Sequence, residues 1–213
     1  MNLVKKTLNE QIYEILKEDI LNGKIAFGEK LVNRELQDKF SVSSTPVRDA
    51  INKLHMDGLI QEVSKTGAKV INFDLNFAEE VNEFICVICS SAVKISAQKG
   101  EADNVIDALE KIINMQENAR NDDEYCYYDF KFHKTFLDFS KNIFLIGTFK
   151  RYNVLRRVLT RIVCEDPENK QEALQHHRSI LEKYKAKDYD GAMEVMLGHY
   201  KYGIEKLKEK FSE

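Results

Sequence analysis

The feature that most constrains the fold is residues 28–71, whose pattern is that of two short helices joined by a tight turn. Apolar side chains at helical spacing form one stripe that begins at Leu31 and a second stripe within residues 47–54. The polar residues 41–44 between the stripes predict the turn of a helix pair. Pro46 fits the first turn of the second helix, where its missing N–H breaks no hydrogen bond. The stretch therefore predicts a helix-turn-helix.

A β-hairpin is predicted directly after this helix pair. Gly58 can adopt the left-handed conformation that ends a helix. Two short β-prone segments follow at residues 60–63 and 68–71, and the loop 64–67 between them contains Gly67. A hairpin in this position is the wing of a winged helix-turn-helix.

Basic and hydroxyl side chains occur where such a fold meets DNA. Arg48 lies one turn into the second helix, and a recognition helix reads base edges with its N-terminal residues. An arginine there can make two hydrogen bonds to a guanine. Side chains on the first helix and on the wing can contact phosphates, which position the protein without specifying a sequence. The other candidate DNA contacts are Ser44, Thr45, Arg34, Lys39, Lys65 and Lys69.

The same residues resemble the GntR family of bacterial transcription regulators. Residues 42–51 read VSSTPVRDAI, which is similar to the recognition helix of that family. The resemblance implies that Arg34, Arg48 and the wing residues Thr66 and Gly67 contact DNA. The family often has arginine where this chain has Ser44, so we expect an altered base preference.

The rest of the chain predicts an all-helical second domain. We expect domains at residues 1–73 and 74–213, the second large enough to bury its own core. No strand pattern and no phosphate-binding glycine loop is visible there. The expected fold is mainly α, a winged helix-turn-helix followed by an antiparallel helical bundle. The expected helices of the bundle span about 76–100, 102–120, 122–140, 142–164, 169–186 and 189–211.

One carboxylate and three imidazoles in this region form a candidate metal-ligand set. Asp129 and His133 are four residues apart and therefore project from one helix face. His177 and His199 lie on two later helices. Helical bundles often build metal sites from facing helices, and this donor set suits Zn, Ni, Mn or Fe. Spacing alone leaves open that these histidines are ordinary core or surface residues.

Residues 76–213 resemble the FCD effector domain of the FadR branch of GntR regulators. The matching motifs are DFKFH at 129–133, HHRSIL at 176–181 and DGAMEVMLGH at 190–199. The resemblance implies that one divalent cation per chain is bound, with Zn favoured and Ni or Mn as alternatives, and that a small-molecule effector occupies the open coordination positions. The implied ligands are Asp129, His133, His177 and His199.

Two positions depart from the family pattern. The first effector-domain helix of the family often carries an inward arginine and glutamate, where this chain has Ile85 and Cys89. The usual partner of an acidic effector is then missing, which favours a less charged ligand. Four arginines on a later helix are candidate replacements, although we interpret them first as a solvated basic face. They are Arg151, Arg156, Arg157 and Arg161.

Composition limits the class of protein. With 43% hydrophobic and 31% charged residues, the chain fits a soluble globular protein and not a disordered one. No run of about 18 apolar residues and no signal peptide is present, so we expect a cytoplasmic protein without a membrane segment. Cys86 and Cys89 match a C-x-x-C pattern without a second pair, so we expect all four cysteines to be packing residues.

Together these patterns predict a ligand-responsive transcription regulator and not an enzyme. The resemblance implies a homodimer on a double-stranded, palindromic DNA operator, a small metabolite such as an organic acid as effector, and repression as the favoured output, because regulators of this kind commonly block promoters. Three alternatives stay open. In the first, the protein is a metal sensor and the cation itself is the signal. In the second, the cation only stabilises the bundle, and in the third, the site is that of a metal-dependent enzyme.

Overall fold

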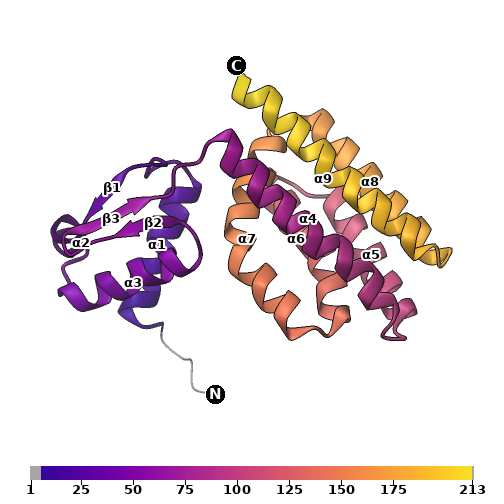
Figure 1. Cartoon of the computed structure of the whole chain (residues 1–213), viewed down its shortest axis with the longest axis horizontal. Helices are drawn as coiled ribbons and strands as arrows, with labels where there is room; N and C mark the ends of the chain where they lie inside the picture. The colour runs from indigo at the N-terminus through magenta and orange to yellow at the C-terminus, as the bar shows by residue number, and fades with distance from the viewer. Residues whose placement is uncertain (1–5, 213) are drawn as a thin grey trace. The chain divides into compact units, whose positions relative to one another are not determined.

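The computed structural model describes residues 6–212 and divides into two compact units between Phe73 and Asp74 (Figure 1). Residues 1–21 carry an Ile/Leu stripe among charged residues, which predicts a first helix, and residues 1–5 of this stretch lie outside the described residues. None of the described helices is long and apolar enough to cross a membrane.

The first unit is a winged helix-turn-helix, as predicted. A small antiparallel sheet with strand order β1-β3-β2 is joined to a core of three helices. The side chains of Leu16, Val47 and Leu54 are fully buried between the helices. Figure 1 shows this unit with its strands beside α1 and α2. The elements are α1 (Leu8–Leu21), β1 (Lys30–Val32), α2 (Asn33–Phe40), α3 (Ser44–Met56), β2 (Ile60–Val63) and β3 (Gly67–Val70).

Strand β1 was not predicted, and the assignment of Leu31 to a helical stripe is wrong. Leu31 lies in β1 opposite Ala68 of β3, and α2 begins only at Asn33. A strand of three residues is too short to show an alternating pattern. Its pairing also requires Gly67, because a Cβ there would lie 2.0 Å from the carbonyl oxygen of Leu31. The close approach of the two backbones therefore explains the glycine.

The second unit is an all-α bundle, also as predicted. Each helix lies within a few residues of its expected range, because its ends carry local signals. Gly100 has a φ of +77° between two of the helices, and Asp166 caps the helix that begins at Pro167. The helices are α4 (Leu75–Ala97), α5 (Ala102–Glu117), α6 (Asp122–Ser140), α7 (Ile143–Val163), α8 (Pro167–Lys185) and α9 (Tyr189–Ser212).

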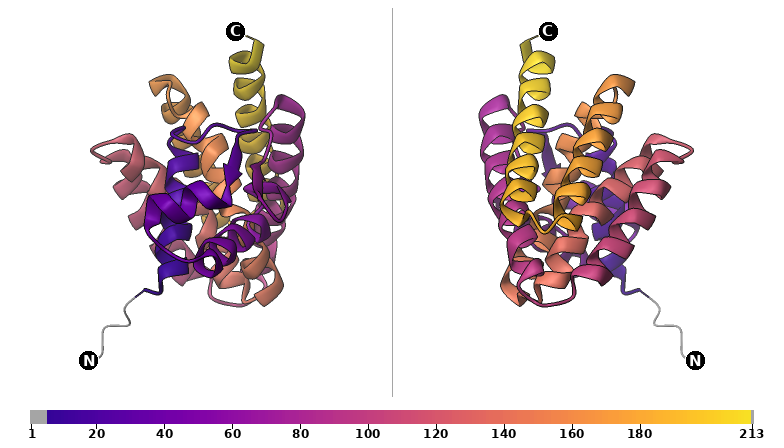
Figure 2. Two further views of the ribbon diagram at one scale, coloured as in Figure 1. Left: turned by 90° about the vertical axis from the view of Figure 1, so that its left-hand side faces the viewer. Right: turned by 90° about the vertical axis from the view of Figure 1, so that its right-hand side faces the viewer.

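The packing of these helices brings distant parts of the sequence together. Helix α9 packs against α4 and α8, and α5 packs against α6 and α8. The views in Figure 2 show α8 and α9 running side by side. The aromatic side chains of Phe132, Phe136 and Tyr184 are fully buried in the centre of the bundle. Side chains of α6 nevertheless meet those of α8 and α9 inside the bundle: Asp129 lies 3.7 Å from His177 of α8, and His133 lies beside His199 of α9.

Candidate functional site

The exposed face of α3 presents the residues predicted to read DNA. Ser44, Thr45 and Arg48 are all exposed in the first half of the helix. Val47 and Ala50 on the opposite face are buried, so the helix orientation is fixed by the core. The N-terminal turns of α3 are thereby available to a major groove.

Two basic residues outside α3 form weak surface ion pairs. Arg34 Nε lies 3.4 Å from Asp38 Oδ2, and Lys39 Nζ lies 3.3 Å from Asp19 Oδ2. Arg34 and Asp38 are both exposed, and such a pair contributes only about 0–1 kcal/mol, so a phosphate can replace this carboxylate at little cost. The Asp19 side chain is only 14% exposed, but Lys39 is 52% exposed and so is accessible to a phosphate.

The wing tip is held by Asn33, a residue that was not among the predicted site residues. The backbone N–H of Asn33 donates to the carbonyl of Thr66 (3.0 Å), and its side-chain Nδ2 donates to the carbonyl of Lys65 (3.2 Å). Lys65 and Thr66 are exposed at the tip, whereas Gly67 is buried in the sheet. Asn33 thus fixes the direction in which the tip projects. Its only sequence signal is a polar residue at the start of a helix.

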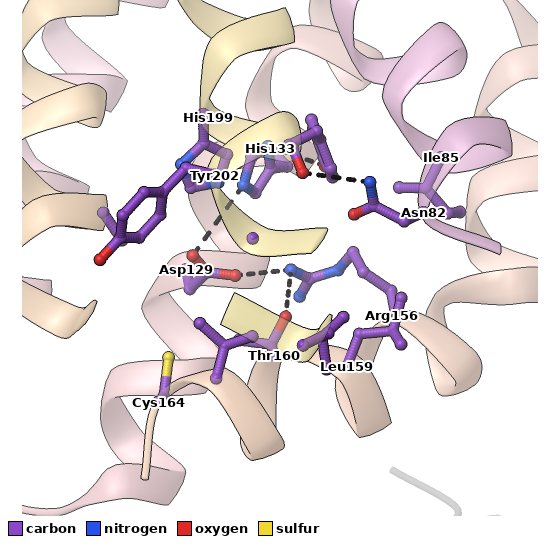
Figure 3. A pocket seen from close by; sticks show the side chains of 15 residues that line it. Asn82, Ile85, Asp129, His133, Arg156, Leu159, Thr160, Cys164, His199 and Tyr202 are labelled. Carbon is purple, nitrogen blue, oxygen red and sulfur yellow. Dashed lines mark hydrogen bonds and ion pairs between the residues drawn. The ribbon is translucent and has the colours of Figure 1, made fainter. Parts of the chain in front are cut away.

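The bundle brings the four predicted metal ligands together. Asp129 and His133 lie on α6, His177 on α8 and His199 on α9. Each offers one ligand atom, and these four atoms all lie within 4.8 Å of one another. Three are buried and His199 is partly exposed. Figure 3 shows Asp129, His133 and His199 converging from two helices.

Hydrogen bonds to the outer nitrogens orient two of the imidazoles. His177 Nδ1 donates to Gln116 Oε1 at 2.8 Å, and His133 Nδ1 lies 3.2 Å from the Tyr200 hydroxyl. Their Nε2 atoms lie 3.7 Å and 3.9 Å from Asp129 Oδ1. Within residues 6–212, His177 Nε2 is buried without a hydrogen-bond partner. Two ring nitrogens directed at one carboxylate fit a metal-binding set of nitrogen and oxygen donors.

The protonation states of the site also fit a cation. Burial lowers the pKa of His133 and His177 well below the ordinary value and lowers that of His199 to about 4. All three imidazoles are therefore neutral at pH 7, which is the form that binds metals. Burial alone would raise the pKa of Asp129, but Arg156 and the three neighbouring imidazoles together outweigh it and hold the pKa below its ordinary value.

Arg156 corrects the interpretation of the basic residues on α7. Arg151 is exposed, as a solvated face requires, but Arg156 is only 3% exposed. Its Nη1 donates to Asp129 Oδ2 at 2.5 Å and to Thr160 Oγ1 at 3.2 Å (Figure 3). Ile85 and Cys89 are fully buried. The positively charged side chain inside the bundle is therefore Arg156 on α7, whereas α4 contributes the uncharged Ile85 and Cys89.

A cavity of about 60 Å³ opens beside this cluster. Asp129, His133, His199 and Arg156 form its polar wall, together with Asn82 and Tyr202. Apolar side chains such as Ile85, Leu159 and Leu207 complete the lining. The cavity has room for roughly four to six water-sized groups, at about 10–15 Å³ each. It is thus an enclosure for a small molecule next to the metal-ligand set.

The four cysteines do not form a site of this kind. All four are free thiols, and Cys89 and Cys164 are buried. Burial raises the pKa of the Cys89 thiol to about 12, which makes it a poor metal ligand and a poor nucleophile.

Two family patterns match the chain. Residues 8–70 match the bacterial regulatory proteins of the gntR family, and residues 80–202 match the FCD domain. An HTH-type transcriptional regulator of Bacillus subtilis, YdhC, is 27% identical over 95% of this chain and 92% of its own length. The gluconate operon transcriptional repressor of Bacillus licheniformis is 24% identical over 82% of this chain and 74% of its own length.

Further similarities concern the DNA-binding unit and the fold. The transcriptional repressor RspR of Escherichia coli is 44% identical over 63 residues, which are 30% of this chain and 28% of that protein. The E. coli protein McbR/YncC has a similar structure, with a TM-score of 0.71 at 20% identity over 97% of this chain and all of that one. The structure of Lar from Listeria monocytogenes gives a TM-score of 0.69 at 18% identity, over 97% and 99% of the two chains.

Proposed function

Because this chain belongs to the gntR family of bacterial regulatory proteins and carries an FCD domain, we propose that it is a metal-dependent repressor that responds to a small organic acid. DNA-binding transcription regulation is the function of the family, which excludes the alternative of a metal-dependent enzyme. The observation that carries the proposal is the convergence of Asp129 with three imidazoles inside the bundle. Repressors among the relatives support the sign of the response.

The four converging side chains hold one divalent cation, with Zn favoured over Ni or Mn. The set is Asp129, His133, His177 and His199. When bound, the cation supplies an open coordination position for an oxygen of the effector. The imidazoles are neutral and the carboxylate is ionised, so each of the four ligands can offer a lone pair to a divalent ion without first losing a proton at pH 7.

Arg156 anchors the acid group of the effector. Its Nη2 atom is buried and has no hydrogen-bond partner in the described part of the chain, and the residue lines the cavity. Nη1 already donates to Asp129 and Thr160, so Nη2 is the nitrogen whose N–H donors can form charge-assisted hydrogen bonds with a carboxylate of the effector. The cavity volume limits the effector to a small acid. Arg156 thus takes the role that an arginine on the first helix has in the family pattern.

The DNA unit reads the operator with α3. Arg48 contacts a base edge, and Ser44 and Thr45 contact bases or phosphates. The exposed wing residues Lys65 and Thr66 approach the DNA backbone, while the buried Gly67 only holds the wing in the sheet. Arg34 and Lys39 exchange their surface carboxylates for phosphates. Two copies of the chain place two α3 helices on a palindromic operator.

Effector binding must change the affinity for DNA by favouring one conformation of the dimer over another. By linkage, the operator then changes the affinity for the effector by the same factor. A cation that is itself the signal, or one that only staples the bundle, predicts no such dependence on an organic acid.

Metal content tests the proposal most directly. We expect elemental mass spectrometry of the purified protein to find about one equivalent of metal per chain. His177→Ala should lose it, because His177 is buried at the centre of the cluster. His176→Ala is the matched control, since His176 is the neighbouring residue and is not part of the four-ligand set. Absence of metal in the wild-type protein, even after incubation with Zn, Ni and Mn, would refute the metal site.

Fluorescence anisotropy with a labelled operator separates the remaining alternatives. An organic-acid effector predicts that DNA affinity of the metal-loaded protein changes when the correct small acid is added. A metal sensor predicts that DNA affinity follows metal concentration without any acid. A structural cation predicts that chelation lowers the melting temperature while no acid alters DNA binding.

A further inference from the structure

We propose that Gln116 is a positioning residue that sets the tautomer of His177, so that the Nε2 lone pair of His177 faces the metal site. The inference rests on the proposed metal function and assigns a role to a residue outside the four-ligand set. It concerns which nitrogen of a buried ring carries the proton, and therefore how tightly the site binds a cation.

Gln116 is a polar residue on the otherwise apolar buried face of α5. It lies in the last turn of α5 and is 1% exposed. Leu109 and Ile113 precede it on the same buried face, at the spacing of a helical stripe. An apolar residue would continue this stripe. A buried amide in its place requires a hydrogen-bonded role.

The partner of that amide is a metal-ligand candidate 61 residues away. Gln116 Oε1 lies 2.8 Å from His177 Nδ1, and an amide oxygen can only accept. The proton of the neutral ring must therefore be on Nδ1. Nε2 then carries a lone pair, and it lies 3.7 Å from Asp129 Oδ1 inside the cluster. This is the arrangement in which the ring can bind a metal.

The opposite orientation of the amide would block the site. An NH₂ group facing His177 Nδ1 would donate to it and shift the ring proton to Nε2. That proton would be directed at Asp129 and would occupy the lone pair that a cation needs. The two orientations of one amide thus correspond to a competent and an incompetent His177.

The ring plane is fixed independently of Gln116. His177 is stacked on Phe132, with ring centroids 3.8 Å apart and planes 12° from parallel. Packing therefore determines where the ring lies but does not distinguish its two nitrogens. Gln116 makes that distinction, so the two contacts have separate functions.

The amide carries a cost that packing alone does not explain. Gln116 Nε2 is buried and makes no hydrogen bond of ordinary length and angle with the described residues, although the Gln116 side chain also interacts with the Tyr125 hydroxyl. An unpaired buried donor costs about 1–3 kcal/mol. Methionine has a similar size and no such donor, so it would pack at least as well. The role of the glutamine therefore lies in its side-chain oxygen, which accepts a hydrogen bond from His177 Nδ1.

Three variants separate this role from simple packing. Gln116→Met removes the acceptor and keeps the size, Gln116→Glu keeps an acceptor, and Gln175→Met makes the same change as the first at an exposed position on α8. The measurement is the affinity for Zn²⁺ alone, by competition with a chromophoric chelator. We expect Gln116→Met to weaken binding by about 10- to 100-fold, the usual effect of losing such a partner. Gln116→Glu and Gln175→Met should bind at least as tightly as the wild type.

The outcomes distinguish the inference from the proposed function. If the wild type binds no Zn²⁺, both fail. If the wild type binds and Gln116→Met binds equally well, only the role of Gln116 fails. Equal loss in Gln116→Met and Gln116→Glu would indicate packing and also overturn it.

A measurement on the wild type covers the case in which Gln116→Met does not fold. Histidine ¹⁵N NMR of the metal-free protein reports which ring nitrogen is protonated before a cation binds. We expect the signal of His177, assigned by its loss in His177→Ala, to show a protonated Nδ1. A protonated Nε2 would refute the assignment whatever the variants show.

Discussion

Replacing Arg156 by methionine should destabilise the metal-free protein far more than replacing an arginine on the surface. Arg156 and Asp129 are each 3% exposed, and their ion pair is closed by a 2.5 Å hydrogen bond. Methionine fills much of the same volume but leaves the Asp129 carboxylate buried without its cation. Removing one partner of a buried pair costs about 3–5 kcal/mol.

The matched control is Arg178→Met. Arg178 Nη2 lies 2.6 Å from Glu117 Oε1, so the distance resembles that of the buried pair. The two side chains are 46% and 49% exposed, however. Water replaces the lost partner there, and the expected cost is about 0–1 kcal/mol. Burial is thus the main difference between the two substitutions.

Urea unfolding followed by circular dichroism, in the presence of a chelator, measures both losses. A bound divalent cation also neutralises Asp129, so we expect the loss for Arg156→Met to shrink when metal is restored. It should also shrink at acid pH. Burial raises the pKa of Asp129, but Arg156 and the neighbouring imidazoles together hold it below its ordinary 3.8. The contribution of Arg156 to stability is therefore present above that value and disappears as the pH falls. Equal losses for Arg156→Met and Arg178→Met at neutral pH would refute the reasoning.

Three further predictions concern both units. Arg48→Ala should weaken operator binding by about 1–3 kcal/mol and relax base preference, and unchanged anisotropy titrations would remove Arg48 from the reading set. Gly67→Ala should cost roughly 1–3 kcal/mol of stability, because its Cβ would overlap the Leu31 carbonyl. Amide hydrogen exchange in the sheet of this variant that is as slow as in the wild-type protein would contradict this. Metal-free stability should fall as the pH drops from 6.5 towards 4, since the pKa values of His133, His177 and His199 are lowered in the folded state and the unfolded chain takes up protons first. A melting temperature constant over that range would reject it.

Much of the fold could be predicted from the sequence because its signals are local. Apolar residues at helical spacing indicate the helices of the bundle, and residues such as Gly100 and Pro167 indicate where helices end and begin. The helix-turn-helix was recognisable for the same reason, with Val47 and Ala50 on the buried face of α3. A residue and its neighbours four positions away determine such patterns.

The candidate metal ligands could be predicted from the sequence only in part. Only Asp129 and His133 share a helix, so their proximity followed from spacing. The inclusion of His177 and His199 depended on a family resemblance, because nothing local relates residues on α6, α8 and α9.

Contacts between residues far apart in the chain depend on the tertiary packing alone. The pairing of Leu31 with Ala68, the burial of Arg156 against Asp129, and the hydrogen bond from His177 to Gln116 were not predictable. The sequence determined which faces of the helices are apolar. Which polar residue on one helix meets which residue on another depends on how those faces pack, and a single buried charge or amide leaves no periodic signal.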